Sequence, residues 1–421
     1  MLAPQPGRTG NAPRPIKILS KAALLEAWAN SRDSTTKAGR PGTDNESARQ
    51  FGANLDSNLD YIARQLRDGR YGFSKLRVVF LPKPDSDVER VICIPTVRDR
   101  LVQRAIGEHI TSKSIFPIYN SSSFGFIKGL GPHDAIRRTL QLRKNYQWCL
   151  KTDIQSFFDK ISRPLLKKQI SKALNGNSLE ALVLKAVDCE AKSTSQNKER
   201  LRKQGLTAGI GIRQGMPLSP LLANLALAEF DKYIEKRRIG MVRYADDLAL
   251  FFRTKDEAED GRQFIKLLLD TLHLSIPAAT GRSKTKIVSK SDPLDFLGRE
   301  IVFLGAANSF VATVSQRQIS KIKDRLIREF SFENRAKNES NLQDTIIDLS
   351  RSVAAYLGIY KDAYNYRSLE SELKGLRRSV LTSIFKDLFG YECLQALSPK
   401  GMKFLGIELP STIEPNVELD V

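Results

Sequence analysis

The sequence predicts an α+β fold in which strand patterns and purely helical patterns occupy different parts of the chain. Short apolar runs rich in β-forming residues, the pattern of strands, occur at residues 76–94, 148–153 and 241–252, with helical spacing between them. From about Ser315 onward the apolar residues recur only at helical spacing, and no strand pattern is found. We therefore expect a sheet-containing part followed by a helical part.

The composition of the 421 residues points to a protein that binds a polyanion. Lys and Arg number 67 against 47 Asp and Glu, which gives a net charge of +20. An excess of cations on this scale favours nucleic acid as the partner. The hydrophobic fraction of 41% and the charged fraction of 27% are those of an ordinary globular protein.

Several classes of protein are disfavoured by what the sequence lacks. The four cysteines lie far apart without a C-x-x-C pair, so neither a disulfide framework nor a zinc ribbon is expected. The three histidines occur in unrelated contexts, which disfavours a His/Cys metal site. No apolar run has the length of a membrane span, and the first residues lack the apolar stretch of a signal peptide. We expect a cytoplasmic protein with no membrane partner.

The N-terminal third begins with an irregular segment and continues into helices and a hairpin. Residues 1–18 are rich in Pro, Gly and Arg and are expected to form a basic arm or a frayed tail. Short helical patterns follow at residues 19–70. Two β-rich runs, Leu76–Leu81 and Arg90–Ile94, are separated by Pro82–Asp87 and predict a hairpin with a basic tip.

The middle of the chain predicts buried strands separated by helices. Residues 148–153 have the pattern of a buried strand that runs into polar residues. Ser162 and Ser219, each followed closely by proline, predict helix N-caps. Residues 190–206 are polar and aperiodic, and we expect a flexible insertion there. Two short apolar runs on either side of residues 245–247 predict a second hairpin.

The C-terminal part is expected to be a separate helical domain with a cationic face. Ile319, Ile322 and Leu326 form one apolar stripe, and a second stripe runs from Leu369 to Ile384, with basic residues beside both. On a chain of net charge +20 we interpret this face as a nucleic-acid contact, with a merely solvated face as the alternative. The candidate contact residues are Arg317, Lys321, Arg325, Lys374 and Arg377.

Three carboxylates stand out by their placement at strand ends. Asp153 ends a predicted buried strand, and Asp246 and Asp247 occupy the tip of the second hairpin. These side chains converge if the strands are neighbours, and they then form an anionic cluster with no local cation. Such a cluster requires divalent ions, and two Mg²⁺ ions about 4 Å apart would support in-line nucleotidyl transfer. Each Asp taken alone is more typical of a cap or a turn.

The carboxylates belong to seven blocks that follow one another between about Gly39 and Gly298. The blocks are Leu81-Pro82-Lys83 with Arg90–Gln103, Ser123-Phe124-Gly125-Phe126, Asp153–Asp159, Gln214–Asn224, Tyr244-Ala245-Asp246-Asp247, Lys284-Thr285 and Phe296-Leu297-Gly298. In content and order they resemble the bacterial reverse transcriptases of the group II intron-like lineage. A lone Tyr-Ala-Asp-Asp would be weak evidence, and the ordered series carries the resemblance.

The resemblance implies a right-hand polymerase fold whose palm contains an antiparallel sheet. The implied domains are fingers at residues 19–145, a palm at residues 146–310, a helical thumb at residues 311–405 and a C-terminal tail at residues 406–421.

The resemblance also implies the ligands of a metal centre. Asp153 and Asp246 would be the principal ligands of two Mg²⁺ ions, for which Mn²⁺ is a possible substitute. Asp247 and the backbone carbonyl of Ile154 would support them.

A further set of implied roles concerns the incoming nucleotide. Lys83 and Arg90 would hold the triphosphate, since their charges compensate the charge on the transferring oxygens. Gln214 would help to seat the sugar, and Phe158 would form a wall beneath it that excludes a ribose 2′-hydroxyl. Lys284 is a candidate contact to nucleic acid.

These roles together describe an RNA-directed DNA polymerase that copies RNA into cDNA from dNTPs and forms an RNA–DNA hybrid. Phe158 favours DNA synthesis, whereas Asp159 is also typical of RNA-dependent RNA polymerases. We expect a structured noncoding RNA as template and antiphage defence as the role. The alternatives are a group II intron maturase without an endonuclease domain and a catalytically inactive RNA-binding scaffold.

Overall fold

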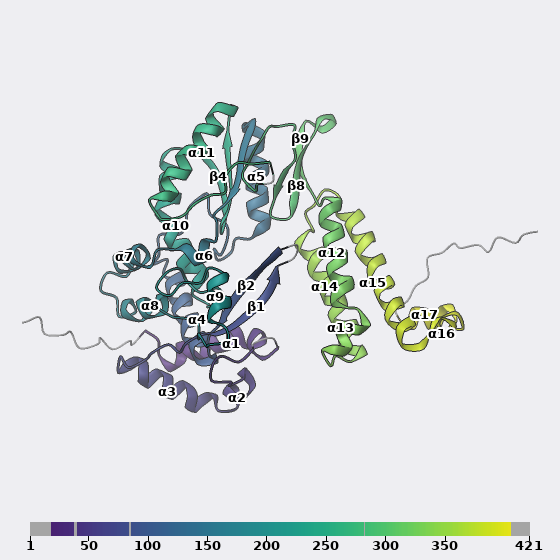
Figure 1. Ribbon diagram of the computed structural model, residues 1–421, viewed down its shortest axis with the longest axis horizontal. Helices are drawn as coiled ribbons and strands as arrows, with labels where there is room; N and C mark the ends of the chain where they lie inside the picture. The colour runs from purple at the N-terminus through teal and green to yellow at the C-terminus, as the bar shows by residue number, and fades with distance from the viewer. Residues whose placement is uncertain (1–17, 38–39, 84–85, 282, 406–421) are drawn as a thin grey trace, which may run out of the picture. The chain divides into compact units, whose positions relative to one another are not determined.

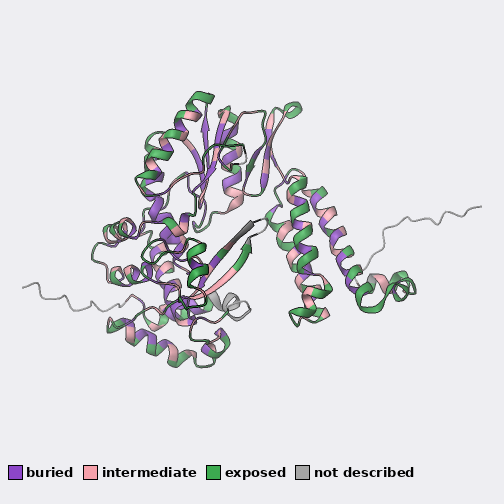
Figure 2. Ribbon diagram, in the orientation of Figure 1, coloured by how far each residue is buried: buried purple, intermediate pink, exposed green. Residues whose placement is uncertain are grey.

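The chain divides into two compact units after Ser289. The computed structural model describes residues 18–37, 40–83, 86–281 and 283–405 (Figure 1). The predicted arm, apart from Ile18, and the predicted tail at residues 406–421 lie outside these residues. Each unit has its own buried hydrophobic core. Figure 2 shows the buried residues in purple.

The N-terminal part of the first unit is a group of helices with one hairpin. The helices are α1 (Lys21–Lys37), α2 (Ala48–Ala53), α3 (Leu55–Arg67) and α4 (Val97–Ser112), and the hairpin strands are β1 (Arg77–Lys83) and β2 (Ser86–Ile94). The α4 helix begins at Val97, because the Thr96 side chain caps it by accepting a hydrogen bond from the Asp99 N–H at 3.2 Å. The hairpin extends further than predicted, since Leu81 pairs with Arg90 and Pro82 with Glu89. Its register shifts after Pro82, which has no N–H for a regular ladder.

A four-stranded antiparallel sheet forms the middle of the first unit. Its strands, in the order β4-β5-β3-β6, are β4 (Gly240–Tyr244), β5 (Asp247–Phe252), β3 (Trp148–Asp153) and β6 (Lys286–Val288). Helix α5 (Pro132–Asn145) contacts β4 and β5, and α11 (Lys255–Asp270) contacts β3, β5 and β6 (Figure 1). Every residue of β5 after Asp247 is buried, so both faces of the sheet are covered.

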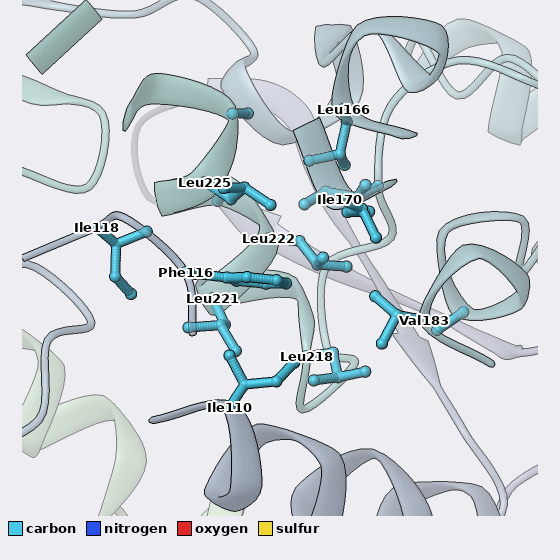
Figure 3. Packing of buried hydrophobic residues seen from close by; sticks show 14 of the residues in the cluster. Ile110, Phe116, Ile118, Leu166, Ile170, Val183, Leu218, Leu221, Leu222 and Leu225 are labelled. Atoms are coloured by element: carbon cyan, nitrogen blue, oxygen red, sulfur yellow. The ribbon is translucent and has the colours of Figure 1, made fainter. Parts of the chain in front are cut away.

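Three further helices complete the core of this unit, namely α7 (Arg163–Leu174), α8 (Glu180–Val187) and α10 (Ser219–Lys236). Figure 3 shows Leu222 and Leu225 of α10 among Leu166 and Ile170 of α7 and Val183 of α8. The predicted N-cap of α10 is wrong by one residue. The cap is Leu218, and the Ser219 hydroxyl instead donates a hydrogen bond to the Arg213 carbonyl at 2.7 Å.

The segment at residues 190–206, where the sequence predicts a flexible insertion, contains secondary structure. This segment contains the short helix α9 (Lys198–Lys203), and Ala191 forms a parallel bridge with Leu76. Leu201 is buried in a small separate cluster with Leu76 and Val91 beneath the hairpin. The segment has no amphipathic period because six residues are too few to show one, and tertiary contacts hold it in place.

The second unit combines a small sheet with a bundle of helices. Its antiparallel strands are β7 (Leu294–Phe296), β8 (Arg299–Leu304) and β9 (Ser309–Thr313), with a short 3₁₀ turn η1 (Gly305–Ala307). Its helices are α12 (Gln316–Glu329), α13 (Phe332–Lys337), α14 (Leu342–Ile359), α15 (Tyr366–Phe389), α16 (Tyr391–Gln395) and α17 (Pro399–Phe404). The two predicted apolar stripes are buried in its core, as Leu326 and Leu373 illustrate.

The expected boundary between palm and thumb at residue 310 stays a prediction, and the chain divides into its two compact units after Ser289. Strands β7 to β9 belong to the second unit, because β9 is hydrogen-bonded to the helical region rather than to the four-stranded sheet. The Tyr364 N–H donates to the Ala312 carbonyl at 2.8 Å, and the Asn365 amide bridges the backbone of Val314.

Candidate active site

The three carboxylates singled out in the sequence converge at one end of the four-stranded sheet. Asp153, the last residue of β3, lies opposite Asp247, the first residue of β5. The Ile154 N–H donates to the Asp246 carbonyl at 3.0 Å, which fixes the β4–β5 turn against the end of β3. Ala245 in this turn has a φ of 57°, a left-handed conformation that a side chain rarely adopts.

The expectation that no cation lies near this cluster is wrong. The Lys284 Nζ lies 2.6 Å from the Asp153 Oδ2, and the Lys151 Nζ lies 3.3 Å from the Asp247 Oδ1. The hydrogen bond to Asp153 raises the pKa of Lys284, so this ammonium group remains charged at neutral pH. Its expected contact with nucleic acid stays a prediction.

The surroundings of Asp246 raise the pKa of its carboxyl group. Burial raises the pKa of Asp246, and the charges of Asp247 and Asp153 act in the same direction, while Lys284 opposes them. The ionised form of Asp246 is therefore destabilised, and a cation that binds beside it would relieve this cost.

The residues present fit a divalent metal. The Asp153 Oδ1 is buried and lacks a hydrogen-bond partner among the described residues, whereas the Oδ2 of the same group accepts from Lys284. Within the described ranges no group of three or more His, Cys, Asp or Glu side chains forms a complete metal cage. Mg²⁺ is usually bound by one or two carboxylates together with waters and substrate phosphates, so such a cage is not required.

A cleft of about 590 Å³ opens beside the carboxylates. The predicted site residues that line it are Asp153, Ile154, Asp246, Arg90, Phe158 and Gln214, together with Lys284. Asp247 is not among the lining residues. Lys83 lies in β1, but its side chain lies outside the described part of the structure. The sequence therefore identified side chains that the fold brings to one cavity, although their individual roles stay predictions.

Phe158 and Gln214 are fixed by their backbone neighbours. Phe158 belongs to the short helix α6 (Phe157–Lys160), and its ring lies edge-on to Phe126 at 6.5 Å between centroids. Phe157 is 3% exposed and packs in the core. The Gln214 carbonyl accepts from the Cys93 N–H of β2 at 2.7 Å, which ties this loop to the hairpin that carries Arg90.

A buried arginine, Arg243, supports the turn between β4 and β5 and was not predicted from the sequence. Arg243 is 0% exposed and forms a bidentate ion pair with Asp231 of α10. Its Nη1 donates to the Asn224 side chain at 3.0 Å and to the Ala245 carbonyl at 3.1 Å. A charged residue inside an otherwise apolar strand was the available signal, because a buried charge requires a partner.

Three of the sequence blocks meet at this arginine. The Phe124 N–H donates to the Arg243 carbonyl at 2.9 Å, and the Asn224 amide donates to the Gly125 carbonyl at 2.9 Å. A Cβ on Gly125 would lie 2.4 Å from the Ala245 nitrogen, so only glycine fits beside the turn. The blocks around Gly125, Asn224 and Ala245 therefore form one packed unit beneath the carboxylates.

The candidate nucleic-acid contacts of the second unit lie on two helices. Arg317, Lys321 and Arg325 are exposed on α12, and Arg325 lies 3.5 Å from Glu329. Lys374 on α15 lies 2.9 Å from Glu370, and the half-buried Arg377 donates to the Ser350 hydroxyl. The α12 residues form the more accessible cationic row.

A cluster of carboxylates in a cleft that Arg90 and Lys284 also line suits an enzyme that transfers nucleotidyl groups. Residues 81–301, more than half of the chain, match the family model described as reverse transcriptase (RNA-dependent DNA polymerase). The chain therefore belongs to the reverse transcriptase family. This match confirms the predicted α+β right-hand polymerase fold and the predicted enzyme class, an RNA-directed DNA polymerase, and it implies dependence on divalent metal ions.

Individual relatives agree with this assignment. Protein YkfC of Escherichia coli is 26% identical over 69% of this chain and 83% of its own length. The group II intron-encoded protein LtrA of Lactococcus lactis is 25% identical over 72% of this chain, which spans about half (49%) of LtrA. The retron Ec83 reverse transcriptase of Escherichia coli is 26% identical over 43% of this chain and 54% of its own length. The predicted bacterial, group II intron-like lineage is confirmed.

Solved structures have a lower similarity to this chain. A Candida albicans telomerase in complex with a fragment of telomeric RNA matches 84% of this chain and 69% of its own, with 13% identity and a TM-score of 0.38. A Cas6-RT-Cas1–Cas2 complex matches 60% of this chain and 25% of its own, with 22% identity and a TM-score of 0.35. Among the helices described between residues 18 and 405, none is long and apolar enough to cross a membrane.

Proposed function

We propose that this protein extends a DNA strand on an RNA template at the cleft between the hairpin β1–β2 and the end of the four-stranded sheet. One observation carries the proposal. The pairing of β3 with β5 brings Asp153, Asp246 and Asp247 together beside a cavity that Arg90 also lines. Carboxylates on one side and a cation on the other suit a substrate that carries phosphates and reacts at one of them.

Asp153 and Asp246 are proposed as the principal ligands of two Mg²⁺ ions, with Mn²⁺ as a substitute and with Asp247 and the Ile154 carbonyl in support. The ions would supply activation of the primer 3′-hydroxyl and stabilisation of the pyrophosphate leaving group. The Oδ1 of Asp153 supports this assignment, because it is an acceptor that no donor of the described residues contacts. Lys284 holds the other oxygen and keeps the carboxylate oriented towards the cleft.

The incoming dNTP is proposed to lie along the remaining walls of the cleft. Arg90, with Lys83 on the opposite strand, would bind the triphosphate, since guanidinium and ammonium groups pair with phosphate oxygens. Gln214 would contact the sugar. The Phe158 ring would occupy the space that a ribose 2′-hydroxyl requires, which selects deoxynucleotides by exclusion.

Primer extension tests the catalytic assignment. On poly(rA)/oligo(dT) with Mg²⁺ and dTTP, the wild-type protein is expected to extend the primer, and Asp246→Asn is expected to show no extension above background. Binding of the template–primer should be unchanged in a filter or anisotropy assay. Asp260→Asn, an exposed carboxylate of α11, is the matched control and should retain full activity. Extension by Asp246→Asn at the wild-type rate would refute the assignment.

Substitutions of Phe158 and of its neighbour Phe157 test the selection of deoxynucleotides over ribonucleotides. Phe158→Ala should increase incorporation of rUTP relative to dTTP, because the excluded volume is removed. Phe157→Leu alters the buried neighbour and should lower the melting temperature without changing this ratio. An unchanged ratio in a folded Phe158→Ala protein would exclude the wall role.

The template is proposed to be a structured noncoding RNA that the protein copies during antiphage defence. The intron maturase is the second candidate, and the similarity to LtrA over 72% of the chain favours it. Sequencing of RNA that copurifies with the protein separates the two, since intron RNA supports the maturase and a separate noncoding RNA supports defence. A protein that binds RNA but fails the primer-extension assay would be the inactive scaffold.

A further inference from the structure

Glu190 occupies the centre of a charged cluster that no sequence block accounts for. Its carboxylate lies 2.7 Å from the Arg163 Nη1 and 2.6 Å from the Arg213 Nη2, and it accepts the Gly209 N–H at 2.9 Å. The two arginine side chains are 6% and 2% exposed. A cluster so well buried must be internally paired, because two arginine charges repel each other in the absence of the carboxylate.

The arginines depend on Glu190 for their neutralisation. The Arg163 Nη2 and the Arg213 Nη1 are buried and have no hydrogen-bond partner among the described residues. Burial would raise the pKa of Glu190, but the Gly209 N–H and the two arginines lower it overall, so the group is ionised at neutral pH. Asp188 is more distant, with its Oδ1 3.9 Å from the Arg163 Nη1.

Both arginines also donate hydrogen bonds to the backbone of one loop, residues 207–213. The Arg163 Nε donates to the Gly211 carbonyl at 2.8 Å, and the Arg213 Nη2 donates to the Thr207 carbonyl at 2.7 Å. The loop ends directly before Gln214. Glu190 therefore fixes both ends of the loop through its two ion pairs.

The same loop is hydrogen-bonded to the helix that carries the aromatic wall. The Ile212 N–H donates to the Phe158 carbonyl at 2.8 Å, and the Gly211 N–H donates to the Ile161 carbonyl at 2.9 Å. Gly211 has a φ of +72°, and a Cβ there would lie 2.5 Å from the Asp159 carbonyl oxygen. Loop and helix are thus in contact along their backbones, and a displacement of one displaces the other.

The backbone of Glu190 extends this connection to the hairpin. Its carbonyl accepts the Leu76 N–H at 2.9 Å, one residue before β1 begins. Glu190 is therefore connected to the hairpin through Leu76, and to Phe158 and Gln214 through the loop at residues 207–213.

We propose that Glu190 is a positioning residue for the nucleotide site. Through Arg163 and Arg213 it holds Phe158 and Gln214 in place. In this way Glu190 sets the discrimination between deoxy- and ribonucleotides. Glu190 does not line the cleft and acts only through its neighbours. This inference rests on the proposed function, since Phe158 and Gln214 must contact the nucleotide for their positions to matter.

The test compares the ratio of kcat/KM for dTTP to that for rUTP on poly(rA)/oligo(dT). Glu190→Gln replaces an acceptor by an amide NH₂ that faces arginine donors. We expect this ratio to fall about tenfold, mainly because KM for dTTP rises, with template–primer affinity unchanged. Glu190→Asp retains the charge and should show a smaller change. Glu199→Gln removes an exposed carboxylate of α9 and should match the wild type.

A second variant keeps the inference falsifiable if Glu190→Gln does not fold. Arg163→Lys retains the positive charge but loses the Nε donor to Gly211, and it should lower the same ratio. If Glu190→Gln folds and leaves both the ratio and KM unchanged, the inference is overturned. If Glu190→Gln does not fold, the same result in Arg163→Lys overturns it. If Phe158→Ala also leaves the ratio unchanged, the proposed wall itself fails. If Phe158→Ala lowers the ratio and the cluster variants do not, only the positioning role fails.

Discussion

Arg243 carries a full positive charge at a place that solvent does not reach. Its guanidinium is neutralised by Asp231 and is fully enclosed, so its contact with the Ala245 carbonyl is made in a medium of low polarity. Such a contact holds a left-handed turn more firmly than an exposed hydrogen bond would. We therefore expect the carboxylates on the turn to be held in place as well.

Asp231→Asn tests the contribution of this pair. The substitution preserves the shape of the side chain but leaves the Arg243 charge buried and uncompensated, which typically costs about 3–5 kcal/mol. We expect the free energy of unfolding in denaturant titrations to fall by this amount and primer extension to fall with it. Glu229→Gln, two residues earlier on α10 and exposed, should change stability by less than about 1 kcal/mol. A wild-type unfolding curve for Asp231→Asn would show that the pair is dispensable.

At the residue scale, the sequence predicted those site residues whose chemical type and whose place at the end of a strand could both be recognised. Asp153 and the Asp246-Asp247 pair lie at the ends of apolar strands, so their convergence could be predicted from the alternation of strand and turn alone. Lys284 and Glu190 could not be placed in this way. Their partners are more than 20 residues distant in the sequence, and a single charged residue in a polar stretch does not identify its partner.

The α9 helix acts as a side support for the hairpin β1–β2. The Arg200 guanidinium forms a bidentate pair with Glu89 and lies 4.0 Å above the Phe80 ring, and the Gln204 side chain accepts the Glu89 N–H at 3.0 Å. The hydrogen bond from Arg200 lowers the pKa of Glu89, as expected of a carboxylate in a paired geometry. The residue after Glu89 is Arg90, so this support acts directly beside the proposed triphosphate contact.

Arg200→Ala should loosen this element without unfolding the protein. Hydrogen exchange measured by mass spectrometry is expected to be several-fold faster in the amides of residues 198–204 and in the adjoining part of β2, because the tertiary contacts that hold a short helix are lost. Arg202→Ala, an exposed neighbour on the same helix, should leave exchange unchanged. Equal exchange in the wild type and Arg200→Ala would show that the pair does not order the segment.

At the element scale, prediction succeeded where an element is long or bounded by clear signals. The strands of the β4–β5 hairpin were placed correctly, because alternation is local. The α9 helix and the division into compact units after Ser289 were not predicted. Both depend on which surface a segment packs against, and a six-residue helix or a three-stranded sheet carries too little pattern to reveal that.

The positive charge of the molecule is distributed over surfaces with different expected uses. Some of it, as in Arg163, Arg213 and Arg243, is buried and neutralised, and it cannot contribute to binding of a polyanion. The exposed row on α12 remains available. The net charge of +20 is therefore a poor measure of how many phosphates the protein contacts.

A salt titration of RNA binding should separate these contributions. Substitution of Arg317, Lys321 and Arg325 by Gln removes three candidate phosphate contacts. The slope of log K against log salt should then become shallower by about two to three, since each contact accounts for about 0.7–0.9 of slope. Substitution of Arg64, Arg67 and Arg70 by Gln removes the same charge elsewhere and should leave the slope near the wild-type value. Equal slopes in the two triple variants would refute a specific role for α12.

Gly125 lies close to Ala245, and beneath them Arg243 contacts Asn224 and Asp231. This packing limits how the chain can be recombined with its relatives. These five positions lie in three separate stretches of sequence, and the residues of each stretch pack against those of the others. A chimera with a crossover between residues 231 and 243 would combine an arginine from one parent with a carboxylate site from another. Crossovers that keep residues 120–252 from a single parent avoid this mismatch. Families of functional chimeras should therefore inherit this whole interval as one block.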